Sequence, residues 1–196
     1  MKVLAFSDIH GDWYQLMELK EKEADLVIVC GDLKGKSNNV EYGLSILAEF
    51  NKKVLIVPGN FERPEEVDEW CLKYDFINLH GRLYEFMGYK FFGIGGALRG
   101  PFNTPFEMEE EDFERFLKGL KSDDKTILVT HNPPYKCVDR TAMGIHIGSK
   151  ALRDFIERNV IKLCLCGHVH ERAGESCIIN DTKVINVGKK GVVIEL

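Results

Sequence analysis

Residues 2–12 read KVLAFSDIHGD, a short apolar run that ends directly in carboxylate and imidazole side chains. Four more apolar runs have the same form, and each is followed within three residues by a polar residue that can bind a metal ion. Short apolar runs bounded by glycine and polar residues are typical of strands buried in a parallel sheet. We therefore expect five buried strands, at residues 3–6, 26–30, 54–57, 127–129 and 161–166.

The segments between these strands have the apolar spacing of helices, at residues 13–22, 40–50, 64–73, 106–120 and 149–159. Strand alternating with helix predicts parallel pairing through right-handed crossovers. The pattern changes at residues 83–95, which read as a β-hairpin, and at residues 176–195, which read as two or three further strands. These hairpins indicate a second sheet. The predicted fold class is α/β, a four-layer αββα sandwich of two mixed β-sheets flanked by helices, in a single domain over residues 1–196.

The composition is that of a soluble globular protein, with 44% hydrophobic and 29% charged residues and a net charge of -5. Without a basic excess or a polybasic run, nucleic acid is not an expected partner. No apolar stretch reaches the roughly 18 residues of a membrane helix, and Asp8 and His10 interrupt the only run near the N-terminus. We expect a cytoplasmic protein without a membrane segment; nothing in the sequence indicates an oligomeric state.

The six cysteines are scattered among apolar neighbours. In a reducing cytosol we expect them to be small buried side chains and not disulfides. Cys164 and Cys166 alternate with leucines and lack the spacing of a zinc site, which indicates a buried strand.

The residues that follow the five apolar runs have the side chains of a metal site. Because the carboxyl ends of parallel strands converge on one crevice, we expect them to meet there. Imidazole, carboxylate and amide oxygen without thiolate suit a divalent transition metal in hydrolytic chemistry. Two ions about 3.5 to 4 Å apart that share a carboxylate would use the whole set. In chain order the candidate ligands are Asp8, His10, Asp32, Asn60, His131, His168 and His170.

The joint pattern D-x-H, G-D, G-N, a strand-end His and G-H-x-H resembles the calcineurin-like metallophosphoesterases over nearly the whole chain. The resemblance implies an αββα sandwich and an enzyme that hydrolyses phosphate esters, either phosphodiesters or phosphomonoesters. It also implies two divalent ions as cofactors. We take manganese as the first candidate, with iron, nickel, cobalt and zinc as alternatives. One ion would be held by Asp8, His10, Asp32 and His170, and the other by Asp32, Asn60, His131 and His168, with Asp32 bridging.

The expected mechanism has both ions bind the phosphate oxygens of a small phosphate-ester substrate while the hydroxide that bridges them attacks phosphorus in line. Asp32, Asn60 and His131 would act in catalysis through the metals. The glycine-rich loop at residues 95–101 would bring Arg99 to the phosphate. His146, just before a predicted helix start, would bind substrate and help in catalysis.

One position departs from the family pattern, which usually reads G-N-H-[DE] where this chain has Phe61 after Asn60. The usual histidine is thought to lie near the leaving group, and an aromatic ring cannot donate a proton there. Such a transfer is worth ~10² to 10⁴ in rate, so its loss would weaken hydrolysis of poor leaving groups, unless His146 replaces it. Phe61 also favours the alternative function, a metal-binding scaffold or protein-interaction module with this fold and little catalysis.

Four further polar residues have simpler explanations. Asp12 is expected to cap the helix that starts at Trp13, and Ser149 to cap a later helix. Glu62 either orients Asn60, contacts substrate or belongs to a solvated loop. His80 precedes a glycine in a turn and is expected to be structural.

Overall fold

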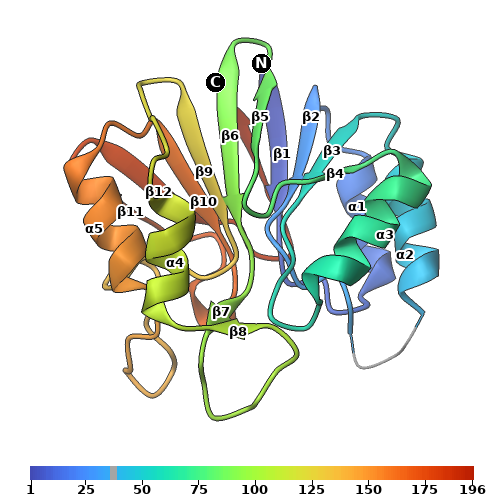
Figure 1. The fold of residues 1–196 in the computed structure, drawn as a ribbon. Coiled ribbons are helices and arrows are strands. Elements are labelled where there is room, and N and C mark those ends of the chain that lie inside the picture. Colours follow the sequence, from blue (N-terminus) through green and yellow to red (C-terminus); the bar gives the residue numbers. More distant parts are fainter. Residues whose placement is uncertain (36–38) are drawn as a thin grey trace.

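Two mixed β-sheets pack face to face in the computed structural model, which describes residues 1–35 and 39–196 (Figure 1). The first sheet has the strand order β13-β1-β2-β3-β4. Its first four strands in the chain are parallel, and β13 pairs antiparallel with β1 at the edge. The strands are β1 (Lys2–Phe6), β2 (Leu26–Val29), β3 (Lys53–Ile56), β4 (Ile77–Asn78) and β13 (Val192–Glu195).

The second sheet has the order β11-β12-β10-β9-β6-β5. Its central strands are parallel, while β5 and β11 are antiparallel edge strands that each form a hairpin with their neighbour. The strands are β5 (Leu83–Phe86), β6 (Tyr89–Ile94), β9 (Thr126–Thr130), β10 (Leu163–Cys166), β11 (Ser176–Ile179) and β12 (Thr182–Asn186). A separate short parallel pair is formed by β7 (Ala97–Leu98) and β8 (Glu107–Met108).

Helices cover the outer face of each sheet, as Figure 1 shows. The first sheet is covered by α1 (Trp13–Lys20), α2 (Val40–Ala48) and α3 (Pro64–Tyr74), and the second by α4 (Glu110–Leu117) and α5 (Lys150–Arg158). One 3-10 turn, η1 (His170–Arg172), follows β10. The predicted αββα sandwich is confirmed. The helix expected at residues 106–120 is shorter than predicted, because Glu107 and Met108 pair with β7 instead.

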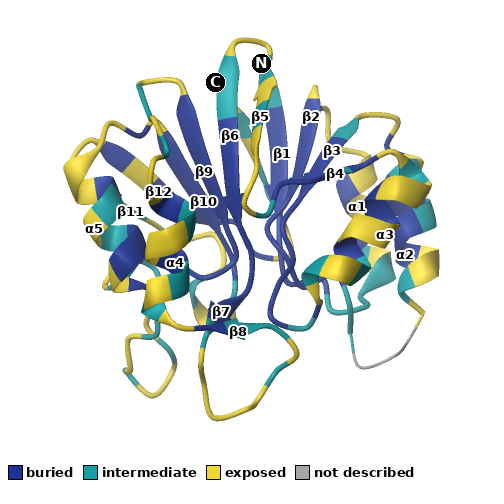
Figure 2. Ribbon diagram, in the orientation of Figure 1, coloured by how far each residue is buried: buried dark blue, intermediate teal, exposed yellow. Residues whose placement is uncertain are grey.

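Side-chain alternation along the strands explains the four layers. On β1, Leu4 and Phe6 pack against the helices while Val3 and Ala5 pack into the core between the sheets. Because successive strand side chains point to opposite faces, each central strand contributes to two cores. Figure 2 shows that these strands are buried along most of their length.

The two predicted helix caps are confirmed. Asp12 Oδ1 accepts the backbone N–H of Gln15 at 3.2 Å, at the start of α1. Ser149 Oγ accepts the N–H of Leu152 at 3.1 Å, at the start of α5, and its hydroxyl donates to Glu110. Each cap fixes where a loop from the carboxyl edge of a sheet enters its helix.

The expectation that no cysteine forms a disulfide is wrong for one pair. Cys137, in the loop after β9, is bonded to Cys177 on β11. Their Cα atoms lie 5.8 Å apart, a separation that a disulfide spans, because the fold brings that loop against the sheet edge. Cys30, Cys71, Cys164 and Cys166 are free and buried, as expected of small apolar side chains.

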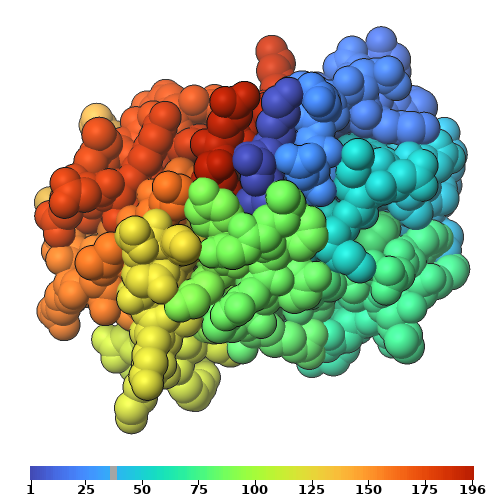
Figure 3. Space-filling view, turned by 90° about the horizontal axis from the view of Figure 1, so that it is seen from above, coloured from blue at the N-terminus to red at the C-terminus, as the bar shows by residue number. Residues whose placement is uncertain are grey.

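The carboxyl ends of the parallel strands all lie at one side of the molecule, the lower side in Figure 1. Figure 3 shows the opposite face, where the first and last strands lie beside the β5–β6 hairpin. There the N-terminal amine of Met1 donates to the carbonyl of Leu196 at 3.2 Å. Among the helices of residues 1–35 and 39–196, none has the length and apolar character needed to cross a membrane.

Candidate metal centre

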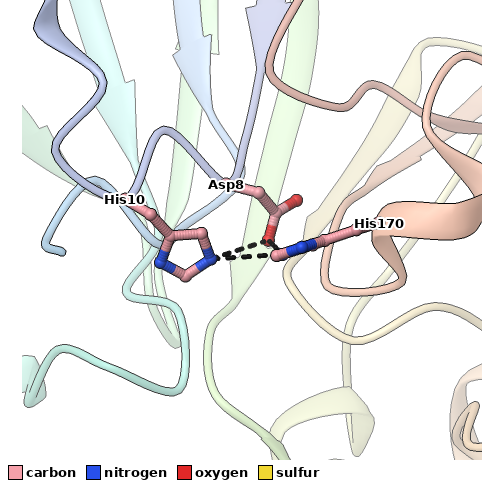
Figure 4. Close-up of side chains that lie close together, drawn as sticks. All are labelled: Asp8, His10 and His170. Carbon is pink, nitrogen blue, oxygen red and sulfur yellow. Dashed lines mark hydrogen bonds and ion pairs between the residues drawn. The ribbon is translucent and has the colours of Figure 1, made fainter. Parts of the chain in front are cut away.

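Three of the predicted ligands form one group at the end of β1 and the start of η1 (Figure 4). His170 Nε2 lies 3.4 Å from Asp8 Oδ1, and His10 Nε2 lies 3.2 Å from His170 Nε2 and 3.9 Å from Asp8 Oδ1. Ligand atoms about 2.0 to 2.2 Å from a common ion lie about 3 to 3.5 Å from one another. The group therefore has the spacing of an ion site.

Three other ligands form a second group, between the ends of β3, β9 and β10. Asn60 Oδ1 lies 3.0 Å from His131 Nε2 and 3.0 Å from His168 Nδ1. Asp32 Oδ2 lies 3.4 Å from His131 Nε2 and 3.5 Å from His10 Nε2, so one carboxylate oxygen is within reach of both groups. The structure thus brings together all seven residues that the sequence singled out, with Asp32 between the two groups.

Contacts behind the ligands fix their orientation. The Nδ1 of His131 lies 2.8 Å from the carbonyl oxygen of Cys30; an N–H there leaves the Nε2 lone pair for a metal. Asp8 Oδ2 accepts the hydroxyl of Ser7 at 2.5 Å, so Oδ1 is the oxygen that faces the histidines. Asp32 Oδ1 accepts the N–H of Phe61 at 3.0 Å, which turns Oδ2 toward the two groups.

Glu62 is buried and joins two of the loops that carry ligands. Its carboxylate accepts the N–H groups of Asp32 at 3.0 Å, Lys34 at 2.7 Å and Gly59 at 2.6 Å. Burial and the neighbouring Asp32 carboxylate raise the pKa of Glu62 to about 7. Of the three explanations considered for Glu62, a solvated loop is wrong; the side chain positions the loops that carry Asp32 and Asn60.

Four of the seven ligands have left-handed backbone conformations, with φ of 58° at Asp8, 48° at His10, 56° at Asp32 and 69° at His168. This conformation costs about 1–2 kcal/mol for a residue with a Cβ, and such residues cluster at functional sites. Backbone hydrogen bonds between the first two loops hold it, with the N–H of Asp8 donating to Gly31 and that of His10 to Asp32. The sharp turns aim side chains from separate strands at one centre.

Two glycines before the ligands are required by close packing of these loops. A Cβ on Gly59 would collide with the carboxylate of Asp32. A Cβ on Gly31, which has a φ of 90°, would lie 2.6 Å from His131 Nδ1 and from the backbone of Gly59. The G-D and G-N patterns therefore have a steric reason.

The electrostatics of the site favour cations. Burial lowers the pKa of His131, but the carboxylates of Asp32 and Asp8 outweigh it and raise that pKa to about 9. Burial raises the pKa of Asp8, but His170 and His131 outweigh it and lower that pKa to about 2. The carboxylates of Asp8 and Asp32 thus favour positive charge in the site, and they raise the pKa of His170 as well as that of His131, whereas burial and His131 lower the pKa of His168 to about 4.

The predicted substrate contacts lie beside the ligands. Arg99 and His146 line a cavity of about 840 Å³ together with Asn60, His168 and His170. His146 Nδ1 lies 2.7 Å from a carboxylate oxygen of Asp139, whereas Arg99 Nε is paired with Glu109 at 2.6 Å. His146 therefore lies where it can contact a substrate in the cavity, whereas Arg99 is paired with Glu109.

Phe61 lies beside the metal ligands themselves. It lines a second hollow with His10, Asp32 and Asn60, and its ring packs edge-on against His10 with centroids 5.2 Å apart.

Sequence reasoning missed Asp139, a buried acid that accepts the N–H groups of Lys136 and Gly148 as well as contacting His146. It follows no predicted strand, so no pattern marked it.

A model of the calcineurin-like phosphoesterase family matches residues 1–172, which contain all seven ligands. The chain belongs to this family. An uncharacterized protein of Methanocaldococcus jannaschii is 34% identical, over 99% of this chain and 91% of that protein.

Two solved structures share the family fold. The protein TT1561 of Thermus thermophilus has a TM-score of 0.76 at 20% identity, over 99% of this chain and 98% of that one. A dimetal phosphatase of Danio rerio has a TM-score of 0.61 at 14% identity, over 96% and 87%.

Proposed function

We propose that this chain is a dimetal-dependent hydrolase of phosphate esters, with manganese as the first candidate for both ions. The observation that carries the proposal is the position of Asp32, whose Oδ2 lies 3.5 Å from His10 Nε2 in one ligand group and 3.4 Å from His131 Nε2 in the other. A carboxylate shared by two groups of imidazole, amide and carboxylate ligands is the donor set of a two-metal hydrolytic site. Membership of the phosphoesterase family supports the same reaction.

Two divalent ions, when bound, would neutralise phosphate oxygens and lower the pKa of the attacking water. The protein's own groups do the rest. Asp8 and Asp32 offset the charge of the ions, and the fixed imidazoles of His131 and His170 hold the centre rigid. Glu62 accepts the N–H groups of Asp32 and Gly59 and so holds the loops that carry Asp32 and Asn60 next to each other.

We propose that His146 replaces the missing histidine only in part as a proton donor to the leaving group. The buried carboxylate of Asp139 contacts its Nδ1 at 2.7 Å, which orients the ring. Its side chain is 34% exposed and lines the cavity that contains three of the metal ligands. Arg99 would bind phosphate only after leaving Glu109, so we assign it a smaller part in substrate binding.

The test is a panel of phosphomonoesters and phosphodiesters, assayed after chelation and after addition of Mn, Ni, Co, Zn or Mg. We expect turnover that is abolished by chelation and restored most strongly by Mn. Metal analysis on the same protein should give two ions per chain. One ion per chain at saturation would contradict the bridging assignment of Asp32.

A binding or scaffold role is the second candidate, and Phe61 is the observation that favours it, since the ring fills the place of the usual proton donor beside His10. The same panel separates the two functions. A scaffold would bind two ions and turn over none of the esters, including aryl esters that leave without protonation.

A further inference from the structure

The cavity beside the metal ligands lies between two loops that extend beyond the carboxyl edges of the sheets (Figure 1). The β7–β8 loop (residues 99–106) joins the two strands of the small pair. The β9–α5 loop (residues 131–149) carries His146. The cavity volume of about 840 Å³ is within the roughly 300–1,000 Å³ of small-molecule sites.

Three large apolar side chains line this cavity and are exposed. Phe102 is 85% exposed, Met143 82% and Ile145 54%. Phe102 also lines the hollow that contains His10 and Asp32, so its ring lies beside the metal ligands. Single exposed apolar residues are ordinary, but three on the walls of one cavity that opens onto a candidate active site mark a binding surface.

The carboxylates of the cavity walls are engaged by hydrogen bonds within the protein. Glu107 accepts the N–H and the hydroxyl of Thr104, both at 2.8 Å, and Glu171 accepts the N–H of Ala142 at 3.0 Å. Glu110 accepts the backbone N–H of Lys150 at 2.8 Å. These bonds hold the loops that present Phe102 and Met143, so the apolar wall is preorganised while its acids are already satisfied.

We propose that this cavity binds the non-phosphate part of the substrate, and that this part is an uncharged aromatic group. The inference rests on the proposed function, because the phosphate of the same molecule would lie on the metal ligands. A ring there would contact the Phe102 ring and the Met143 thioether, both of which interact favourably with aromatic faces.

The test measures binding and not turnover. Phenylphosphonate and methylphosphonate carry the same phosphonate group, and the first has a phenyl ring where the second has a methyl group. The ratio of their affinities for manganese-loaded protein therefore measures how much the ring contributes to binding. We expect phenylphosphonate to bind about tenfold more tightly by calorimetry. Phe102→Ala should reduce that ratio to about three or less, and Met143→Ala should reduce it in the same direction.

Leu72→Ala is the matched control, since Leu72 is 90% exposed on α3 and lines neither cavity. It should keep the tenfold ratio. Equal affinity for the two phosphonates, in protein that hydrolyses esters, would overturn the aromatic assignment and leave the proposed function standing. A tenfold ratio that survives both cavity variants, each shown to be folded by circular dichroism, would place the ring elsewhere and also overturn it. If neither phosphonate binds, both the proposed function and the aromatic assignment of the cavity are contradicted.

Discussion

Asp32 is the residue on which both ligand groups depend, and its backbone conformation decides how it should be replaced. With a φ of 56°, an alanine would add strain to the loss of charge, whereas asparagine tolerates this region and keeps an oxygen for the N–H of Phe61. We predict that Asp32→Asn loses at least one metal ion and lowers kcat/KM by at least about 100-fold, more than the 10–100-fold typical of residues behind the ligands. Metal analysis and turnover measure both effects.

Asp75→Asn is the control, because Asp75 has the same φ of 56° and is exposed at the end of α3. It should change neither metal content nor turnover. An Asp32→Asn protein that keeps two ions and normal activity would show that the shared carboxylate has been wrongly assigned.

The presence of Phe61 in place of the usual histidine leads to a prediction about how rate depends on the leaving group. Without the usual histidine, the native enzyme should hydrolyse nitrophenyl esters much faster than alkyl esters, since alkoxides need a proton to depart. Phe61→His should flatten the dependence of rate on leaving-group pKa and raise the turnover of alkyl phosphates more than that of aryl phosphates. The measurement is a leaving-group series on both proteins at equal metal occupancy.

Phe61→Leu is the control, because it removes the aromatic ring without adding an imidazole. It should leave the dependence of rate on leaving-group pKa as steep as in the native enzyme. A flat dependence in the native enzyme would mean that another acid is present, and His146→Ala should then steepen it. If no substitution at either position alters the slope, proton transfer does not limit the reaction.

At the residue scale, the ligands were predictable because each follows a buried apolar strand, and parallel strands deliver such residues to one edge. The groups that orient the ligands and His146 were not predictable. Asp139 lies in an irregular loop, and the carbonyl of Cys30 that contacts His131 has no signature in the sequence. Their roles depend on how loops fold back, which periodicity does not encode.

At the scale of elements, the disulfide ties the β9–α5 loop to β11. It closes a loop of 40 residues, and removing such a link costs about 2 to 4 kcal/mol of unfolding free energy. We predict that dithiothreitol lowers the stability of the native protein by this amount, measured by urea unfolding. Cys177 is half-buried on the edge strand β11, whereas Cys137 and the four free cysteines are buried.

The Cys137→Ser, Cys177→Ser double variant is the control for the reductant. It should start at the lower stability and show no further change on addition of dithiothreitol. A native protein that is unaffected by the reductant would contradict a stabilising role for the bond.

The same elements show where prediction from pattern stops. Apolar runs and hairpins predicted the strands of the two sheets except β4, which is two residues long. They also missed β7 and β8, which are two residues each and lie within a loop and a predicted helix. The disulfide partners are 40 residues apart and lie in ordinary apolar surroundings. Both features follow from tertiary packing of loops at the carboxyl edges.

For the whole molecule, the metals should stabilise the fold. Ligands that bind the native state alone add RT ln(1 + [L]/Kd), on the order of 3 to 4 kcal/mol at hundreds of Kd. For a chain of this size that corresponds to about 10 °C in Tm. We predict a Tm lower by about this amount after chelation, measured by calorimetry, with recovery on addition of Mn.

Asp32→Asn provides the control for the chelator, since a protein that cannot hold the full metal set should show a smaller shift. Coincident melting curves for native protein with two ions and with none would contradict the prediction.

The ligands are divided between the two sheets in a way that bears on how the protein is made. Asp8, His10, Asp32 and Asn60 extend from the first sheet, whereas His131, His168 and His170 come from the second and are synthesised last. A nascent chain that ends before β9 has the carboxylates of Asp8 and Asp32 but lacks three of the four imidazoles. On the proposed ligand set, full metal affinity would therefore arise only once residue 170 has been synthesised and has folded into place. Which ion occupies the site is decided by the pool of free ions that the finished chain meets, because affinity alone ranks other divalent ions above manganese.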